Sequence, residues 1–366
     1  MRAEAIVDLS AIKHNVALLK EKSGTNLLAV VKADAYGHGL VPVAKAALDA
    51  GASMLGVALL EEAITLREAG ITAPILAWLV QPGSDFAKAI ELDIDLAAGS
   101  LKALHEIQAA SVKKKARVHL ELDTGMTRGG FLSEWSELSV TDVAGLEIVG
   151  VFSHFARADE PSEQQNQDQL DRFIEMVTKL EDLGFTSVMR HISNSAATLA
   201  NSTATFDMVR TGIAIYGLTP DVAMGSSKEF GLRPAMQLRA ALYLVKDVPA
   251  GTPVGYGASE STTRDTKLGV VTMGYADGIP RIAHNAGVWI NGKRAPIIGR
   301  VSMDQFVVDL GPDSTAKSGD WVVIFGNGSH GEYTADDWGA ASGSINYEIV
   351  TRIGPRVPRI YSAHIY

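Results

Sequence analysis

The length, composition and charge of the chain exclude several classes of protein. It has 366 residues, 46% hydrophobic and 20% charged, proportions typical of a globular protein with more than one domain. Forty-two acidic and 33 basic residues give a formal charge of −9, which argues against nucleic acid or an anionic membrane as a partner. The absence of cysteine excludes disulfides, thiolate metal sites and a cysteine nucleophile. No apolar run of signal-peptide or membrane-spanning type is present, so we expect a cytoplasmic protein without a metal site.

Strand-like and helix-like segments alternate between residues 24 and 218. Eight apolar or β-branched runs are typical of buried strands: Leu27–Val31, Met54–Val57, Pro74–Trp78, Ile94–Ala97, Arg117–Leu122, Leu146–Phe152, Ser187–Ile192 and Met208–Ile213. Amphipathic stretches lie between them, including Leu40–Ala50, Leu60–Ala69, Leu101–Ala110 and Glu163–Leu183. This order predicts an α/β fold, a closed (β/α)8 barrel of the TIM type. An open doubly wound sheet also alternates, but no Gly-x-Gly-x-x-Gly turn follows the first strand.

Beyond about residue 230 the pattern becomes mainly β. Short strand-like runs occur at Gln237–Val245, Lys267–Met273, Val288–Ile290, Pro296–Ile298, Gln305–Leu310 and Trp321–Phe325. Turn-forming residues separate them, and Asn291-Gly292 between two apolar runs predicts a hairpin. We therefore predict a barrel domain over residues 1–230 and a mainly β domain over residues 231–366. The run Ala3–Leu9 precedes the first barrel strand, and we expect it to pair with the β domain instead.

The most informative stretch is residues 30–39, Val-Val-Lys-Ala-Asp-Ala-Tyr-Gly-His-Gly. It places Lys32 at the carboxyl end of a buried strand, where desolvation lowers the pKa of an amine. A neutral lysine amine can attack an aldehyde and form a Schiff base. A single lysine at a strand end more often extends its amine to solvent, so this interpretation depends on the residues around it.

Polar residues also follow other predicted strands. In a barrel the chemistry lies at the carboxyl ends of the strands. Arg128 follows the fifth strand, His154 the sixth, Asn194 and Ser195 the seventh, and Arg210 lies in the eighth. Each alone has a structural explanation, such as a helix N-cap for Ser195. Their joint placement on one rim predicts a site.

Four motifs, in this order along the chain, resemble the alanine racemase family. They are Val31–Gly39, Val254-Gly-Tyr-Gly, Gly274-Tyr-Ala-Asp-Gly and Arg300-Val-Ser-Met-Asp, and the resemblance extends from Ile6 to Arg359. The family consists of pyridoxal-phosphate enzymes with a (β/α)8 barrel and a C-terminal β domain. The resemblance implies interconversion of L- and D-alanine, supply of D-alanine for peptidoglycan, and a homodimer with shared active sites.

The resemblance also implies a role for each catalytic residue. Lys32 would hold the cofactor through its amine and act as the base on one face of the substrate. Tyr256 of the partner subunit would be the base on the other face. A hydrogen bond to His154, itself linked to Arg210, would stabilise the tyrosine as a phenolate. Arg210 would face the pyridine nitrogen and keep it unprotonated, because a guanidinium has no acceptor.

The remaining implied contacts concern binding. The cofactor residues are Tyr36, Asn194, Ser195, Tyr347 and the backbone amides of Gly212 and Ile213, in addition to Lys32 and Arg210. The substrate carboxylate would contact Arg128 and the partner's Met303 amide, and the partner's Tyr275 would narrow the entrance. Tyr347 beside the reacting carbon would restrict the size of the substrate.

One position departs from a common family pattern. Many alanine racemases carry there a lysine modified to a carbamate, whereas this chain has Glu121. We predict that the Glu121 carboxylate supplies the negative charge that orients Arg128. The alternative is that Glu121 points elsewhere and another anion, such as chloride, serves the arginine.

Three other functions are compatible with the sequence, and one of them fits it more closely than the other two. A serine or broad-specificity racemase is the closest alternative, because only the shape of the pocket separates it from an alanine enzyme. A decarboxylase of the same architecture is less favoured, since Arg210 stands where those enzymes carry an acidic residue. A pyridoxal-phosphate carrier without turnover is also less favoured, since about 135 residues follow the barrel.

Overall fold

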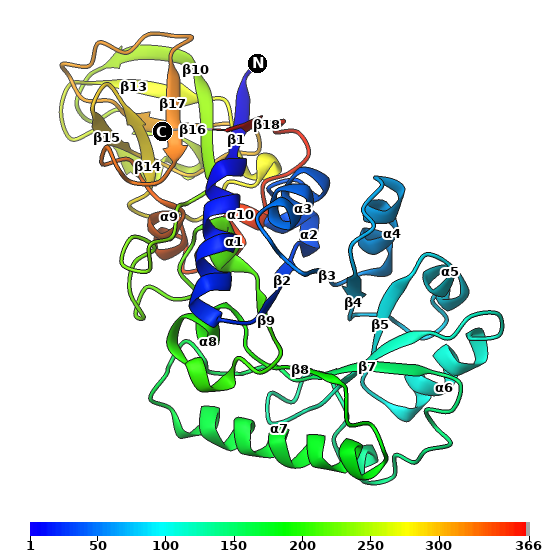
Figure 1. Cartoon of the computed structure of the whole chain (residues 1–366). Coiled ribbons are helices and arrows are strands. Elements are labelled where there is room, and N and C mark those ends of the chain that lie inside the picture. The colour runs from blue at the N-terminus through cyan, green and yellow to red at the C-terminus, as the bar shows by residue number, and fades with distance from the viewer. Residues whose placement is uncertain (364–366) are drawn as a thin grey trace. The chain divides into compact units, whose positions relative to one another are not determined.

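The structure, a computed structural model, describes residues 1–363 (Figure 1). Its backbone forms two compact units. One unit contains residues 12–35 and 40–232, and the other contains residues 1–11, 36–39 and the chain from Arg233 onward. Each unit has its own sheet and is described by itself.

The first unit is a parallel eight-stranded barrel. Its strands are β2 (Asn26–Val30), β3 (Met54–Val57), β4 (Ile75–Ala77), β5 (Ile94–Ala98), β6 (Arg117–Glu121), β7 (Glu147–Phe152), β8 (Met189–His191) and β9 (Met208–Thr211). They follow the order β8-β7-β6-β5-β4-β3-β2-β9, and every paired neighbour is parallel. The two end strands also meet, because the Asp207 amide donates to the Arg190 carbonyl and the Arg210 amide to the Ser193 carbonyl. The predicted barrel is confirmed, with each strand at its predicted place.

Helices follow the strands around this unit. They are α1 (Leu9–Ser23), α2 (Lys32–Tyr36), α3 (Leu40–Asp49), α4 (Leu60–Glu68), α5 (Phe86–Glu91), α6 (Leu101–Ala110), α7 (Gln164–Asp182) and α8 (Ser195–Ala200). The first residues of α1 and the last residue of α2 are assigned to the other unit. Short 3₁₀ turns are η1 (Ser133–Ser136), η2 (Ser202–Ala204) and η3 (Ile213–Tyr216). The apolar spacing of α7 shows why it forms: Leu170, Phe173, Val177 and Leu180 repeat at helical intervals and are all buried. The four helices predicted from spacing are confirmed to within two residues at each end.

The second unit is built on an eight-stranded mixed sheet. Its strands are β1 (Ala3–Asp8), β10 (Met236–Val248), β13 (Thr266–Val271), β14 (Gly287–Ile290), β15 (Lys293–Pro296), β16 (Phe306–Asp309), β17 (Trp321–Phe325) and β18 (Arg359–Ser362). The long strand β10 pairs with β1, β13 and β17, which makes it the centre of the sheet. A separate hairpin of β11 (Pro253–Val254) and β12 (Glu260–Ser261), the 3₁₀ turns η4 (Tyr256–Ala258) and η5 (Tyr275–Asp277), and the helices α9 (Ala335–Ala341) and α10 (Asn346–Thr351) complete the unit.

The hairpin at Asn291-Gly292 shows how local chemistry sets register. Both residues have positive φ, 50° and 79°, as a two-residue hairpin turn requires, and Ile290 pairs directly with Lys293. The predicted hairpin is confirmed. The strand predicted at residues 296–298 is misplaced, because the tight turn starts β15 at Lys293. Ile297 instead forms an isolated bridge with Val308.

Candidate active site

The chain turns left-handed immediately after Lys32. Ala33, Asp34 and Ala35 have φ of 53°, 53° and 51°, a conformation that costs an L-residue about 1–2 kcal/mol each. Hydrogen bonds at both ends hold the turn: the Ala35 amide donates to the Val31 carbonyl at 2.9 Å, and the Leu40 amide donates to Asp34 Oδ1 at 2.8 Å. Strained backbone that is held in this way commonly serves a functional site.

Glu62 on α4 is a third anchor of this turn. Its carboxylate accepts the amide of Ala33 at 2.5 Å and, at the start of its own helix, the amides of Ala58 and Leu59 at 3.0 Å each. One carboxylate thus fixes the backbone that follows β2 and the backbone that precedes α4.

The environment of Lys32 suits a nucleophilic amine. Its Nζ lies 5.8 Å from the centroid of the Trp78 ring. Burial and the nearby positive charge of Arg128 lower the pKa of Lys32, while the Glu62 carboxylate partly opposes them. A lower pKa increases the fraction of neutral amine, which is the reactive form.

Arg210 on β9 is the centre of a buried hydrogen-bond cluster. Its guanidinium donates to the carbonyls of Ser153 at 2.6 Å and His191 at 2.8 Å, and to His154 Nδ1 at 3.1 Å. Burial lowers the pKa of Arg210 to about 10, which leaves it protonated at neutral pH. The cluster therefore places a fixed cation on one side of His154.

The hydrogen bond from Arg210 determines the tautomer of His154. A guanidinium only donates, so the Nδ1 atom that faces it must accept and the ring proton lies on Nε2. Burial and the neighbouring arginine lower the pKa of His154 to about 3, so the ring is neutral. Its Nε2 lies 3.5 Å from Asn194 Nδ2, which is a donor and therefore cannot accept the Nε2 proton. The Nε2–H group can donate to an anionic oxygen.

Backbone amides converge on Ser195 at the start of α8. Asn194 caps this helix through Oδ1, which accepts the Ala197 amide at 3.0 Å. Ser195 Oγ accepts the amides of Gly212 at 2.9 Å and Ala214 at 3.4 Å, from the turn into η3. Backbone amides grouped around a buried hydroxyl form a site that is suited to binding an anion.

Glu121 is the last residue of β6 and is largely buried. Burial raises the pKa of its carboxyl, while the positive charges of Arg210 and Arg128 oppose the rise. Within residues 1–363 no hydrogen bond joins Glu121 to Arg128, so these side chains interact through charge alone. Asp123 shapes the loop that carries Arg128, because its Oδ1 accepts the amides of Gly125 and Thr127 at 3.0 Å each.

In the second unit, Tyr36 packs beside Tyr347 of α10. Their ring centroids are 6.3 Å apart, and burial raises the pKa of the Tyr36 phenol. The next residue is Gly37, with φ of 78°, and a Cβ there would lie 2.3 Å from the Val350 carbonyl oxygen. Only glycine fits this close approach, which explains the Tyr-Gly pair of the motif.

Two further predicted site residues, Tyr256 and Met303, line one depression of about 430 Å³. The complete lining is Gly255, Tyr256, Ser302, Met303, Asp304 and Gln305. Tyr256 is 71% exposed and Met303 53% exposed, high values for large side chains. Gly255 and Gly257 flank Tyr256 with φ of 70° and 77°, which only glycine adopts readily.

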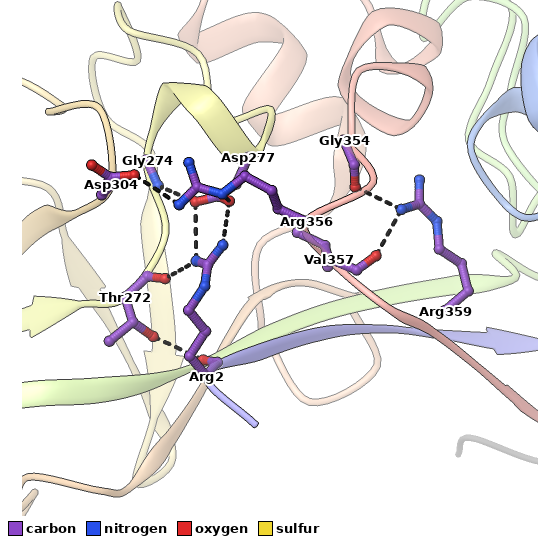
Figure 2. A network of polar contacts seen from close by, with 9 residues as sticks. All are labelled: Arg2, Thr272, Gly274, Asp277, Asp304, Gly354, Arg356, Val357 and Arg359. Atoms are coloured by element: carbon purple, nitrogen blue, oxygen red, sulfur yellow. Dashed lines mark hydrogen bonds and ion pairs between the residues drawn. The ribbon is translucent and has the colours of Figure 1, made fainter.

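A buried carboxylate supports the turn that carries Tyr275. Figure 2 shows Asp277, which is fully buried, between the guanidinium groups of Arg2 and Arg356. It also accepts the Gly274 amide at 3.0 Å, and Arg356 continues to Asp304 at 2.7 Å.

Backbone hydrogen bonds extend this support to Met303. The Tyr275 amide donates to the Ser302 carbonyl at 3.1 Å, and the Ala276 amide donates to the Met303 carbonyl at 2.9 Å. The segments that carry Tyr275 and Met303 are therefore held together.

Pattern reasoning missed several residues of this site. Glu62, Trp78 and the buried histidines 119 and 191 carry no motif of their own. Only His119 had a usable signal, because it lies two residues before Glu121 and therefore on the same face of β6.

The sequence matches two family models. The alanine racemase N-terminal domain matches residues 7–220, and the alanine racemase C-terminal domain matches residues 235–361. The chain belongs to the alanine racemase family. This membership confirms the resemblance inferred from the motifs, and the family depends on pyridoxal phosphate.

Named relatives and solved structures agree with the family assignment. An alanine racemase of Salinispora arenicola is 50% identical over 98% of each chain, and one of Frankia casuarinae is 49% identical over 99% of this chain and 96% of the relative. The crystal structure of alanine racemase from a D-cycloserine-producing Streptomyces lavendulae has a TM-score of 0.97 at 47% identity, covering 100% of this chain and 98% of that one. The Bacillus anthracis alanine racemase with bound L-Ala-P has a TM-score of 0.91 at 39% identity, covering 99% and 95%. Over residues 1–363, no helix combines the length and apolar character needed to span a membrane.

Proposed function

We propose that the protein interconverts L-alanine and D-alanine with pyridoxal phosphate as cofactor. The observation that carries the proposal is Arg210, a buried cation that donates to His154 at the carboxyl end of the barrel. A permanently protonated donor beside the cofactor ring keeps its nitrogen unprotonated and limits side reactions such as transamination.

The residues of the chain fit this cofactor. Lys32 has a lowered amine pKa, and the Ser195 hydroxyl and nearby amides suit a phosphate. Following the family resemblance, we propose that these residues bind the cofactor: Lys32, Tyr36, Asn194, Ser195, Arg210, Tyr347 and the amides of Gly212 and Ile213.

Two bases are needed because the α-proton must leave and return on opposite faces. When bound, pyridoxal phosphate withdraws electrons from the α-carbon and so acidifies its proton. Lys32 Nζ holds or returns the proton on one face. The phenolic oxygen of Tyr256, from the partner subunit of a homodimer, does so on the other.

His154 makes the tyrosine a usable base. Its Nε2–H donates to the Tyr256 oxygen and stabilises the phenolate, while Arg210 holds Nδ1 as the acceptor. A tyrosine with an ordinary pKa near ~10 would be a weak base at neutral pH.

The substrate carboxylate binds to Arg128 and to the Met303 amide of the partner subunit, and Tyr275 of the partner subunit narrows the entrance. Glu121 orients Arg128 by its negative charge. In the cell the protein acts in the cytoplasm and supplies D-alanine for peptidoglycan.

A chiral assay in D₂O tests the reaction and its specificity. We expect deuterated D-alanine from L-alanine in the presence of pyridoxal phosphate, with much slower exchange of L-serine and L-lysine. Comparable rates on serine would identify a broader racemase. No exchange of any amino acid by cofactor-loaded protein would contradict the proposal.

Mixing two inactive variants tests the shared site. Lys32→Ala and Tyr256→Phe are each expected to be inactive, but a mixed dimer contains one site with both native residues. After random exchange of subunits the mixture should recover about a quarter of wild-type activity. Sedimentation of tagged subunits verifies that the dimers have exchanged. If no activity is recovered after exchange, Lys32 and Tyr256 of each active site come from the same subunit.

A further inference from the structure

A line of buried side chains continues inward from Arg210. Arg210 Nη1 lies 3.2 Å from His191 Nδ1, and His191 Nε2 lies 2.9 Å from His119 Nδ1. His119 Nε2 then lies 3.5 Å from Asp95 Oδ2. His191, His119 and Asp95 are at most 1% exposed. We call these three residues the His-His-Asp chain.

The His-His-Asp chain crosses three strands that are not all neighbours. His119 is on β6 and His191 on β8, and β7 lies between them. The space is provided by Gly150 of β7, which pairs with His119, because a Cβ at Gly150 would lie 2.1 Å from His119 Nδ1. Phe152 of the same strand stacks on the His191 ring, with centroids 5.1 Å apart and planes 9° from parallel. The barrel is therefore shaped around this line.

The donors and acceptors determine every proton position along the line. The guanidinium can only donate, so His191 Nδ1 accepts and its proton lies on Nε2. That proton is donated to His119 Nδ1, so the His119 proton lies on Nε2 and faces Asp95. Each ring is therefore held in a single tautomer.

Asp95 ends the line as an anion. Burial would raise the pKa of its carboxyl, but hydrogen bonds with His119 and Arg117 lower it on balance. Arg117 Nε donates to Asp95 Oδ1 at 2.8 Å, and the Arg117 side chain is 39% exposed. The hydrogen-bonded series of side chains therefore reaches the solvent at the amino ends of the strands. A carboxylate there accepts hydrogen bonds and donates none, which fixes the direction of the whole line.

We propose that Asp95, acting through His119 and His191, is a positioning residue that holds the Arg210 guanidinium in place. If His191 carried its proton on Nδ1, that proton would face the guanidinium, and Arg210 would lose an acceptor. The His-His-Asp chain thus keeps the arginine pointed at His154 and at the cofactor ring. Its catalytic consequence rests on the proposed function, whereas its tautomers do not.

The tautomers of the wild-type protein are the first test. Long-range ¹H–¹⁵N correlation of histidine-labelled, cofactor-loaded protein at neutral pH should show His119 and His191 protonated on Nε2 alone. Assignment uses His119→Gln and His191→Gln. A proton on Nδ1 of either ring overturns the proposal, whatever the activity of the protein.

Asp95→Asn is the second test. The amide of the asparagine can donate a hydrogen bond to His119 Nε2, which would reverse the direction of donation along the His-His-Asp chain. We expect a mixed or Nδ1–H tautomer for His119 and a kcat for alanine lowered about 10- to 100-fold, with the KM changed much less. Glu147→Gln is the matched control. Glu147 is the other partner of Arg117, at 3.2 Å, and is 54% exposed, so its loss should leave both tautomers and kcat unchanged.

Gly150→Ala perturbs the His-His-Asp chain without changing any charge. Its methyl group would displace the His119 ring from His191, and we expect the same loss of kcat with Asp95 intact. Wild-type kcat in folded Asp95→Asn or Gly150→Ala protein would overturn the proposal. A wild-type protein that lacks racemase activity but shows both Nε2–H tautomers would contradict the proposed function and leave the His-His-Asp chain supported.

Discussion

Three charged side chains interact near the carboxyl ends of the barrel strands: Arg210, Arg128 and Glu121. The two cations repel each other, since the charge of Arg128 lowers the pKa of Arg210 while that of Glu121 raises it. A single carboxylate therefore compensates two arginines, and removing its charge affects both of them.

Glu121→Lys provides a direct test of this role. A lysine places a third cation beside the two arginines, so we expect kcat/KM to fall by tenfold or more, about 1.4 kcal/mol of lost stabilisation per factor of ten. Bicarbonate should restore part of the activity of this variant by forming a carbamate, and it should leave the wild type unchanged. Wild-type activity that depends on bicarbonate, or full activity in Glu121→Ala, would show that another anion serves Arg128.

His154 makes stability depend on pH. Its pKa is about 3 in the folded protein and near 6.5 in an unfolded chain, so between these values the unfolded state binds one more proton. Stability contributed by this group is present above pH 6.5 and falls as the pH is lowered, by at most about 1.4 kcal/mol per pH unit.

The measurement is the free energy of urea unfolding between pH 5 and 7. His154→Gln should reduce the slope with pH by up to one proton. His330→Gln, at an exposed position, is the control and should keep the wild-type slope. An identical slope in wild type and His154→Gln would show that His154 binds protons equally in the folded and unfolded states, contrary to its lowered pKa.

At the scale of elements, the left-handed turn α2 decides how Lys32 is presented. A right-handed continuation would carry the chain after β2 in another direction. The turn persists because Glu62 of α4 and Asp34 bind its backbone amides. Its strain is thus balanced by neighbouring elements and not by its own sequence.

Glu62→Gln weakens this anchor and changes the charge near Lys32. The hydrogen bonds lose their ionic character, so we expect a loss of about 1–3 kcal/mol in the free energy of unfolding. Because the Glu62 charge raises the pKa of Lys32, its removal should lower that pKa further.

The ascending limb of kcat against pH should therefore move to lower pH in Glu62→Gln. Glu61→Gln, at the preceding and exposed position of α4, is the matched control. A shift of the limb to higher pH would mean that Glu62 does not act on Lys32 through its charge.

At the scale of the whole molecule, Asp277 joins parts of the chain that are far apart in sequence. It binds Arg2, which lies 275 positions earlier in the chain, and also Arg356. Asp277 is itself the last residue of η5, the turn that begins with Tyr275, and it accepts the Gly274 amide that precedes this turn (Figure 2).

Asp277→Asn should weaken this link. Hydrogen bonds to a charged group contribute about 1.5–3 kcal/mol, so we expect a loss of that size in the free energy of unfolding and a higher KM for alanine. Asp49→Asn removes an exposed ion pair with Lys13 and should cost less than about 1 kcal/mol. Equal effects of the two variants would show that the buried network has no special role.

Features that depend on neighbouring residues in the chain could be predicted from the sequence alone. The eight barrel strands follow from short apolar runs, the hairpin from Asn291-Gly292, and the place of Lys32 from the end of a buried strand. Motif order was enough to indicate the family. These signals are local, because propensity and periodicity act over a few residues.

The contacts between buried polar groups, by contrast, could be found only in the folded structure. His119 and His191 are 72 residues apart, and their contact depends on the register of three strands and on the missing side chain of Gly150. Glu62 and the left-handed turn are joined across 29 residues. Such contacts leave no periodic signal, because a buried polar side chain is placed by whatever donor or acceptor the fold brings to it, and that partner lies elsewhere in the chain.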